Sequence, residues 1–253
     1  MPDQKFTISI AGEEVKFTLS KRLGTRNLRL RLDQSKRLYI SAPRFMSTRR
    51  IVEFLEEKQH WLKRNLEKIE EKNKETAASS KQFRDGEVFN LLGEKYHLDL
   101  RFTQRKYPKA YFECTEAGNN MLILELHEDT AFRELAEIGR ETIEKLYRKY
   151  AKEHFTQRLE ELNAEYYGFK YGDIRVKNQR TRFGSCSSKR NLNFNWRVIM
   201  APRKIVDYLL IHELCHTKEM NHSKKFWDLV EHACPNYKAH RTWLKKRGHV
   251  LAI

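Results

Sequence analysis

The chain contains little cysteine, proline or glycine, and it has no long apolar run. Its 253 residues include 4 cysteines, 5 prolines and 10 glycines. Cys114, Cys186, Cys215 and Cys234 show no CxxC spacing, which argues against a disulfide or zinc-ribbon framework and predicts reduced thiols. No apolar run approaches the ~20 residues that a transmembrane helix needs. The first residues, Met-Pro-Asp-Gln-Lys-Phe, lack the apolar segment of a signal peptide. We therefore expect a cytoplasmic protein with no membrane partner.

Two common catalytic signatures are also missing. The sequence has no Walker or GxGxxG pattern, which argues against the usual phosphate-binding loops. Ser185 lies in a Gly-Ser-Cys-Ser-Ser run and lacks the GxSxG context of a serine hydrolase. This run is more simply interpreted as a turn than as an anion cradle.

Charge of one sign is in excess. Lys and Arg number 50 against 34 Asp and Glu, which gives a formal net charge of +16. Such an excess favours an anionic partner, either a nucleic acid or a nucleotide, although alternating charges on helices can also serve solubility alone. Basic residues cluster on both sides of the motif described next, namely Arg175, Lys177, Arg180, Arg182, Lys189, Arg190 and Arg197 before it, and Lys224, Lys225, Lys245, Lys246 and Arg247 after it.

The most informative motif is His-Glu-Leu-Cys-His at residues 212–216, an HExxH pattern. Pro202 suits the start of a helix, and no Gly or Pro interrupts the approach to the motif. On a helix His212 and His216 share one face with the apolar residues that precede them. Buried imidazoles are costly without a partner, and a divalent metal supplies one. The motif therefore predicts a metal site, with one Zn²⁺ per chain as the preferred ion.

A third ligand is needed for the three-ligand, open-position arrangement of catalytic zinc. His222 follows His216 by six residues, and it can return to the metal if Asn221 adopts a left-handed conformation in the turn. Glu219 and Glu231 are the rival third ligands. Glu213 is placed to act as the general base, because it adjoins a ligand without being one.

An ordered series of segments extends well beyond the motif. The segments are residues 178–187 (NQRTRFGSCS), 191–197 (NLNFNWR), 201–202 (AP), 212–216 (HELCH), 221–223 (NHS) and 226–227 (FW). This series resembles the YgjP-like metallopeptidase-domain family, although Phe183 departs from the tryptophan that the family usually shows there. The resemblance implies a zincin-like catalytic domain, related more distantly to the SprT-like and WLM proteases, with His212, His216 and His222 as ligands and Glu213 as catalytic base.

The patterns along the chain predict an α+β fold. Short alternating segments between residues 5 and 40 predict antiparallel strands, and an apolar stripe from Ser47 or Thr48 to Ile69 predicts one helix. Residues 72–82 are polar and predict a linker or a frayed helix end. We therefore expect an N-terminal strand and helix region at 1–82 and a zincin-like hydrolase domain at 83–253, unless the two form one continuous unit.

Within the second region three further elements are predicted. These are a hairpin over residues 111–126, a long helix over residues 131–166, and a strand over residues 191–200 that could form the edge of the cleft. The central HExxH helix should pack on a small sheet.

Three functions compete for this site. The first is a zinc-dependent metallopeptidase acting on peptides. The second is a metal-dependent nucleotide pyrophosphohydrolase, in which the basic residues neutralise phosphate charge. The third is a DNA-associated, SprT-like protease localised by its basic surface.

Overall fold

A computed structural model describes residues 4–10, 13–33, 35–78, 81–179, 181–251 and 253. The chain divides into two compact units, Met1–Ala78 and Ser79–Ile253. Helices and three small sheets are combined in them, which confirms the predicted mixture of α and β structure. None of the described helices is both long enough and apolar enough to cross a membrane.

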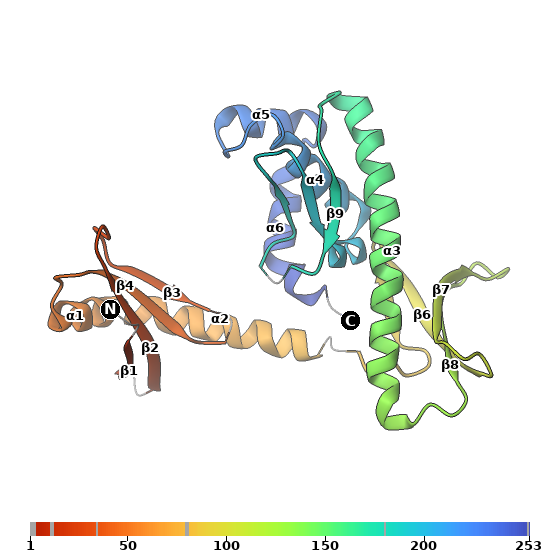
Figure 1. The fold of residues 1–253 in the computed structure, drawn as a ribbon, viewed down its shortest axis with the longest axis horizontal. Coiled ribbons are helices and arrows are strands. Elements are labelled where there is room, and N and C mark those ends of the chain that lie inside the picture. The colour runs from red at the N-terminus through yellow and green to blue at the C-terminus, as the bar shows by residue number, and fades with distance from the viewer. Residues whose placement is uncertain (1–3, 11–12, 34, 79–80, 180, 252) are drawn as a thin grey trace. The chain divides into compact units, whose positions relative to one another are not determined.

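The first unit contains a four-stranded sheet whose strand order is β1-β2-β4-β3 (Figure 1). The sheet is mixed, which corrects the expectation of antiparallel strands alone. β4 pairs parallel with β2 on one side and antiparallel with β3 on the other. The strands are β1 (Gln4–Ile10), β2 (Glu13–Arg22), β3 (Arg29–Leu32) and β4 (Leu38–Pro43).

Two helices, α1 (Thr48–Glu57) and α2 (Gln59–Ala78), follow in the first unit. The prediction of a single helix was wrong at Lys58, whose N–H bonds to the carbonyls of both Phe54 and Leu55 and ends the first helix. Ser47 caps α1 by accepting from the Arg50 N–H, as its position indicated. The helix α2 runs on to Ala78, so the first part of the expected linker is helical; its residues 79 and 80 lie outside the described residues.

The second unit begins with a four-stranded sheet of order β5-β6-β8-β7. Its strands are β5 (Val88–Leu91), β6 (Glu94–Thr103), β7 (Lys109–Cys114) and β8 (Asn120–His127). β7 and β8 pair antiparallel around Gly118, which confirms the predicted hairpin.

The long helix α3 (Phe132–Tyr166) organises the second unit (Figure 1). Its 35 residues span about 50 Å at 1.5 Å per residue. It packs against β7 and β8, and also against β9 (Ile174–Lys177), the 3₁₀ turn η1 (Trp196–Met200) and α4 (Arg203–Cys215). Tyr147, fully buried at its centre, donates to the Asn90 carbonyl at 2.7 Å and lies beside Trp196. The predicted helix is confirmed, and it forms the support of the site.

A three-stranded sheet of order β10-β11-β9 lies next to this support. β9 (Ile174–Lys177) pairs parallel and β10 (Gly184–Cys186) antiparallel with the central β11 (Leu192–Asn195). The expected strand over 191–200 is therefore shorter and is not the edge. Asn195 ends it, because its side chain accepts from the Arg197 N–H and starts the 3₁₀ turn η1 (Trp196–Met200). β10 forms the edge instead.

The remaining elements complete the second unit. They are α4 (Arg203–Cys215), α5 (Lys224–Ala233), α6 (Tyr237–Arg247) and the short turn η2 (Gly248–Val250). The helix α4 packs on α3, β10, α5 and α6, and Leu210, Leu214 and Cys215 on it are fully buried.

Candidate metal centre

The start of α4 is fixed by a close backbone approach. Gly93 has φ +87°, and a Cβ there would lie 2.9 Å from Pro202 Cα, so only glycine fits. The adjacent Leu92 N–H donates to the Ile199 carbonyl at 2.7 Å. The chain turns at Pro202, and α4 begins at Arg203.

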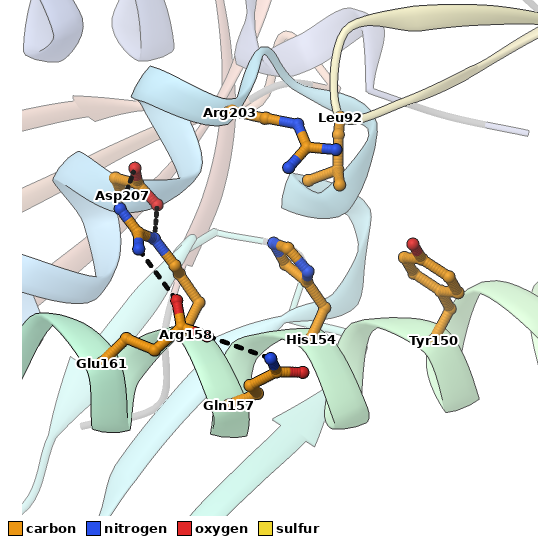
Figure 2. A pocket seen from close by; sticks show the side chains of 8 residues that line it. All are labelled: Leu92, Tyr150, His154, Gln157, Arg158, Glu161, Arg203 and Asp207. Carbon is orange, nitrogen blue, oxygen red and sulfur yellow. Dashed lines mark hydrogen bonds and ion pairs between the residues drawn. The ribbon is translucent and has the colours of Figure 1, made fainter.

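An ion pair then ties α4 to α3. The Arg158 guanidinium donates to both carboxylate oxygens of Asp207, at 3.0 and 3.1 Å, and also to Glu161 (Figure 2). These groups line a cavity of about 450 Å³ together with Arg203 and His154. None of the predicted site residues lines this cavity, and His212 and Glu213 lie about one and a half turns beyond Asp207 on α4.

The helix ends as the motif requires, by a mechanism that the sequence did not indicate. The N–H groups of Thr217 and Lys218 bond back to the carbonyls of Leu214 and Cys215, which tightens the chain after α4. Asn221 does not adopt the expected left-handed conformation. Its side chain instead accepts from the Ser223 N–H. Ser223 caps α5, as predicted, by accepting from the Phe226 N–H.

This turn brings three histidines together. One ring nitrogen from each of His212, His216 and His222 lies within 4.8 Å of the others. The Nε2 atoms of His212 and His222 are 3.2 Å apart. A tetrahedral zinc with Zn–N bonds of about 2.0–2.1 Å separates its ligand nitrogens by about 3.3 Å. The three-imidazole donor set and the spacing of the His212–His222 pair therefore fit a transition-metal ion with an open coordination position.

His216 is oriented by the backbone. Its Nδ1 lies 3.0 Å from the Glu219 carbonyl oxygen. A carbonyl oxygen only accepts, so Nδ1 donates and Nε2 keeps a free lone pair for a metal. Glu219 thus contacts the site through its backbone, and neither its carboxylate nor that of Glu231 belongs to the group of donors found among the described residues.

Aromatic side chains from α5 form the floor under the histidines. The Phe226 ring stacks on His216 at 4.4 Å and meets His212 and His222 edge-on at 4.9 and 4.8 Å. Trp227 stacks on His222 at 5.4 Å. Phe226 is fully buried, so it removes water from one side of the imidazoles and restricts their rotation.

Burial keeps the imidazoles neutral. The pKa of His212 is lowered to about 3, chiefly by burial and also by the neighbouring His216 and His222. Burial also lowers the pKa of His216 and of His222. Within the described residues, Nδ1 of His212 is buried without a hydrogen-bond partner. Neutral imidazole is the form that binds metal, so the site is prepared for a cation at neutral pH.

Glu213 lies beside the histidines and is only 4% exposed. Burial raises its pKa to about 8, although the charge of Arg182 acts to lower it. Its Oε2 has no hydrogen-bond partner among the described residues. A Cβ on Gly184 would lie 2.5 Å from Oε1, so the edge strand β10 can approach the carboxyl group only through a glycine.

The turn η2 contacts the residue that precedes the strand β10. Gly248 of η2 lies against the ring of Phe183, the residue just before β10, and a Cβ on Gly248 would be 2.1 Å from the ring tip. The Phe183 carbonyl also accepts a hydrogen bond from the Asn195 N–H at 2.7 Å. The position of Gly184 therefore depends on a residue more than sixty positions further along the chain.

The sequence did not single out one cation near the histidines. Arg241 of α6 lies over the Trp227 ring at 5.0 Å, and its charge acts to lower the pKa of both His212 and His222. The sequence around Arg241, three residues before Leu244 on a short helix, contains no pattern that predicts a place near the histidines. Of the predicted basic cluster, Arg182 lies close enough to Glu213 for its charge to act to lower the pKa of that carboxyl group. Arg175 pairs with Asp173 instead. Arg180 lies outside the described residues.

Comparison with known proteins identifies the family. A profile described as "YgjP-like, metallopeptidase domain" matches residues 26–247. Among solved structures, the metallopeptidase zymogen abylysin of Pyrococcus abyssi is similar over 37% of this chain and 95% of its own, with 22% identity and a TM-score of 0.34. The metallopeptidase zymogen jannalysin of Methanocaldococcus jannaschii is similar over 36% of this chain and 95% of its own, with 20% identity and a TM-score of 0.31. No curated protein matches. Because the profile covers most of the sequence, the chain belongs to the YgjP-like metallopeptidase-domain family.

Proposed function

We propose that the chain is a zinc-dependent peptidase in which His212, His216 and His222 hold the metal and Glu213 is the general base. The observation that carries this proposal is the convergence of three neutral imidazoles within 4.8 Å beside a buried carboxyl group. Family membership supports a metal-dependent hydrolase. The identity of the ion and the roles of the residues are part of this proposal.

The residues divide the chemistry between them. Zinc bound here would polarise a substrate carbonyl and make water acidic near neutral pH. Glu213 has one oxygen without a protein partner, so it can accept a proton from water and later deliver it to the leaving amine. A pKa raised by burial suits this exchange, because the group can both take and return a proton near neutrality.

The edge strand favours a peptide substrate. β10 pairs on one side with β11, and no described strand pairs on its other side. An extended peptide could add there through main-chain hydrogen bonds. Gly184 on this edge touches Glu213, so a peptide aligned along β10 would bring a carbonyl group close to the base.

A second candidate is a nucleotide pyrophosphohydrolase. It is favoured by two cations, since Arg182 acts on Glu213 and Arg241 on His212 and His222. Both arginine side chains are exposed and could neutralise phosphate oxygens. The same base would then activate water for attack on phosphorus.

The metal content of the purified chain tests whether the three histidines bind a metal ion. Activity assays on the same samples test which class of substrate is hydrolysed. We expect about one zinc per chain by mass spectrometry and its loss in His212→Ala and His222→Ala. His97→Ala is the matched control, because His97 is an exposed histidine on β6 outside the group of donors. The wild type and all variants are then assayed with casein, a peptide mixture and nucleoside triphosphates.

The outcomes separate the two candidates. Peptide cleavage that disappears with the metal supports the peptidase, whereas phosphate or pyrophosphate release that disappears in the same way supports the second candidate. A folded wild type that binds no zinc, manganese, nickel or iron after reconstitution would contradict both.

A further inference from the structure

The sheet of the first unit has two chemically unlike faces. One face is apolar and packs on α1 and α2 around Ile51, Leu55 and Leu62. Successive residues of a strand point to opposite sides, so the residues between these apolar positions form the other face. The apolar set from the strands is Phe17, Leu19, Leu38, Ile40 and Ala42.

The opposite face, here called the outer sheet face, is polar and open. The strand register arranges it in rows, one of which runs Thr18, Tyr39 and Arg31, and the next Ser20, Ser41 and Arg29. Each residue is exposed or half-exposed. The outer sheet face comprises Lys16, Thr18, Ser20, Arg22, Arg29, Arg31, Tyr39 and Ser41.

The outer sheet face carries four cations. Among the side chains that the structure describes, Lys16, Arg22, Arg29 and Arg31 form no ion pair with a carboxylate. Some cations elsewhere in the same unit are paired, as Lys36 is with Glu70 at 3.0 Å. Four cations gathered on one small sheet produce a local positive potential that attracts an extended polyanion.

The neutral residues of the face suit a strand of nucleic acid. Thr18, Ser20 and Ser41 are short, so a chain can lie close to the sheet between the arginines. The Arg31 guanidinium lies 4.7 Å from the centre of the Tyr39 ring. The Tyr39 hydroxyl donates a hydrogen bond to Oδ2 of Asp33 at 3.2 Å, which holds the hydroxyl in place. Tyrosine rings and guanidinium planes both stack on nucleic-acid bases.

We propose that the outer sheet face binds single-stranded nucleic acid. Arg29, Arg31, Arg22 and Lys16 contact phosphates, and the Arg31–Tyr39 pair stacks on a base. An acidic polypeptide would match the charge equally well but has no base to stack on this pair, which is why nucleic acid is favoured. The inference is independent of the metal centre and of the proposed peptidase activity.

Fluorescence anisotropy of the full chain with a labelled oligothymidine of about 16 nucleotides tests the proposal. Each phosphate contact on a single strand contributes about 0.7 to the slope of log affinity against log salt. Arg29→Gln with Arg31→Gln should lower this slope by about 1.4 and weaken binding about 25-fold at 0.1 M salt. Lys63→Gln with Lys68→Gln is the matched control, because it removes the same charge from exposed positions of α2 and should change binding far less.

A second pair of variants tests the stacking. Tyr39→Leu should weaken binding at least about fivefold without changing the salt slope, whereas Tyr39→Phe keeps the ring and should bind nearly as well. His212→Ala should bind like the wild type, which separates this surface from the metal centre.

Four results would overturn the inference. They are no binding at about 50 mM salt, an equal loss in the α2 control, equal binding of a duplex of the same length, and full competition by polyglutamate at equal charge. The last result would assign the face to acidic polypeptides instead. Circular dichroism of each variant checks that the sheet is folded.

Discussion

The polar side chains near the two ends of α4 differ in whether they have hydrogen-bond partners. Near its start, Asp207 is bound by Arg158 through two hydrogen bonds, and Arg158 also meets Glu161 (Figure 2). Near its end, Glu213 and His212 each have a buried polar atom without a hydrogen-bond partner in the described part of the chain. One helix thus carries a satisfied ionic cluster and an unsatisfied polar one, separated by less than two turns.

This difference separates structural from chemical roles. The paired carboxylate of Asp207 fixes α3 against α4 through two charge-assisted hydrogen bonds. Unpaired buried groups cost free energy, and they persist where a ligand or a reaction uses them. The comparison therefore assigns stability to the Asp207 end and chemistry to the Glu213 end, and each of the following experiments tests that assignment.

The largest expected effect is on activity. Glu213→Gln should lower turnover about 10²- to 10⁴-fold, because the amide cannot accept the proton from water. Metal content should stay near the wild-type value, since Glu213 is not among the donors. Glu161→Gln, on α3 beside the start of α4, is the control and should keep most of the activity. Full metal-dependent turnover in Glu213→Gln would show that the base is assigned wrongly.

Gly184→Ala should have the next largest effect. Its Cβ would lie 2.5 Å from Oε1 of Glu213, so either the carboxyl group or β10 must move. A displacement of about 1 Å can cost about 10²-fold in rate, and we expect a loss of this order in kcat with unchanged zinc binding. Ser185→Ala, on the same strand, should be nearly neutral. An active Gly184→Ala enzyme would mean that the edge strand does not position the base.

Breaking the ion pair should affect stability and leave the metal centre intact. Arg158→Met or Asp207→Asn should lower the free energy of unfolding by roughly 1–2 kcal/mol, because the bidentate pair is only about one-third exposed. Urea unfolding measures the loss, and the double variant should recover part of it. If zinc is lost as well, the two ends of α4 are not independent.

The smallest effect concerns pH in the metal-free protein. The pKa of Glu213 is raised to about 8 by burial, so its contribution to stability is present at low pH and is lost as pH rises through 8. The pKa of His212 is lowered to about 3, so its contribution is lost as pH falls below about 6.5. Between pH 6.5 and 8 only the Glu213 effect acts.

We therefore expect the wild type in chelator to lose about 1 kcal/mol more than Glu213→Gln over that interval. Urea unfolding at the two pH values measures it. Equal losses in the two proteins would indicate that Glu213 is already ionised in the fold.

The comparison also shows what the sequence could predict. The i, i+4 spacing of His212 and His216 and the cap at Ser223 are local patterns, and the structure places these residues as expected. His222 joined them although the predicted turn conformation at Asn221 was wrong, because backbone bonds to Leu214 and Cys215 turn the chain instead. The assignment of ligands and base stays a prediction.

Features that depend on distant contacts were missed for a physical reason. The sequence left open whether residues 191–200 form an edge strand or an ordinary sheet strand, since alternation identifies a strand without indicating its neighbours in the sheet. Arg241 reaches the histidines only because α6 folds back across Trp227. Lys58 interrupts a continuous apolar stripe, so periodicity gave no sign of the break between α1 and α2.

The contact of Phe183 with Gly248 has a consequence for local unfolding. The chain between these two residues contains the edge of the sheet, the three histidines and the base, and the contact closes it into a loop. Opening of either end releases the other, so β10 and the C-terminal turn should exchange their amide hydrogens as one cooperative unit. In the proposed peptidase, access of a peptide to the β10 edge would thus be coupled to the order of the turn η2.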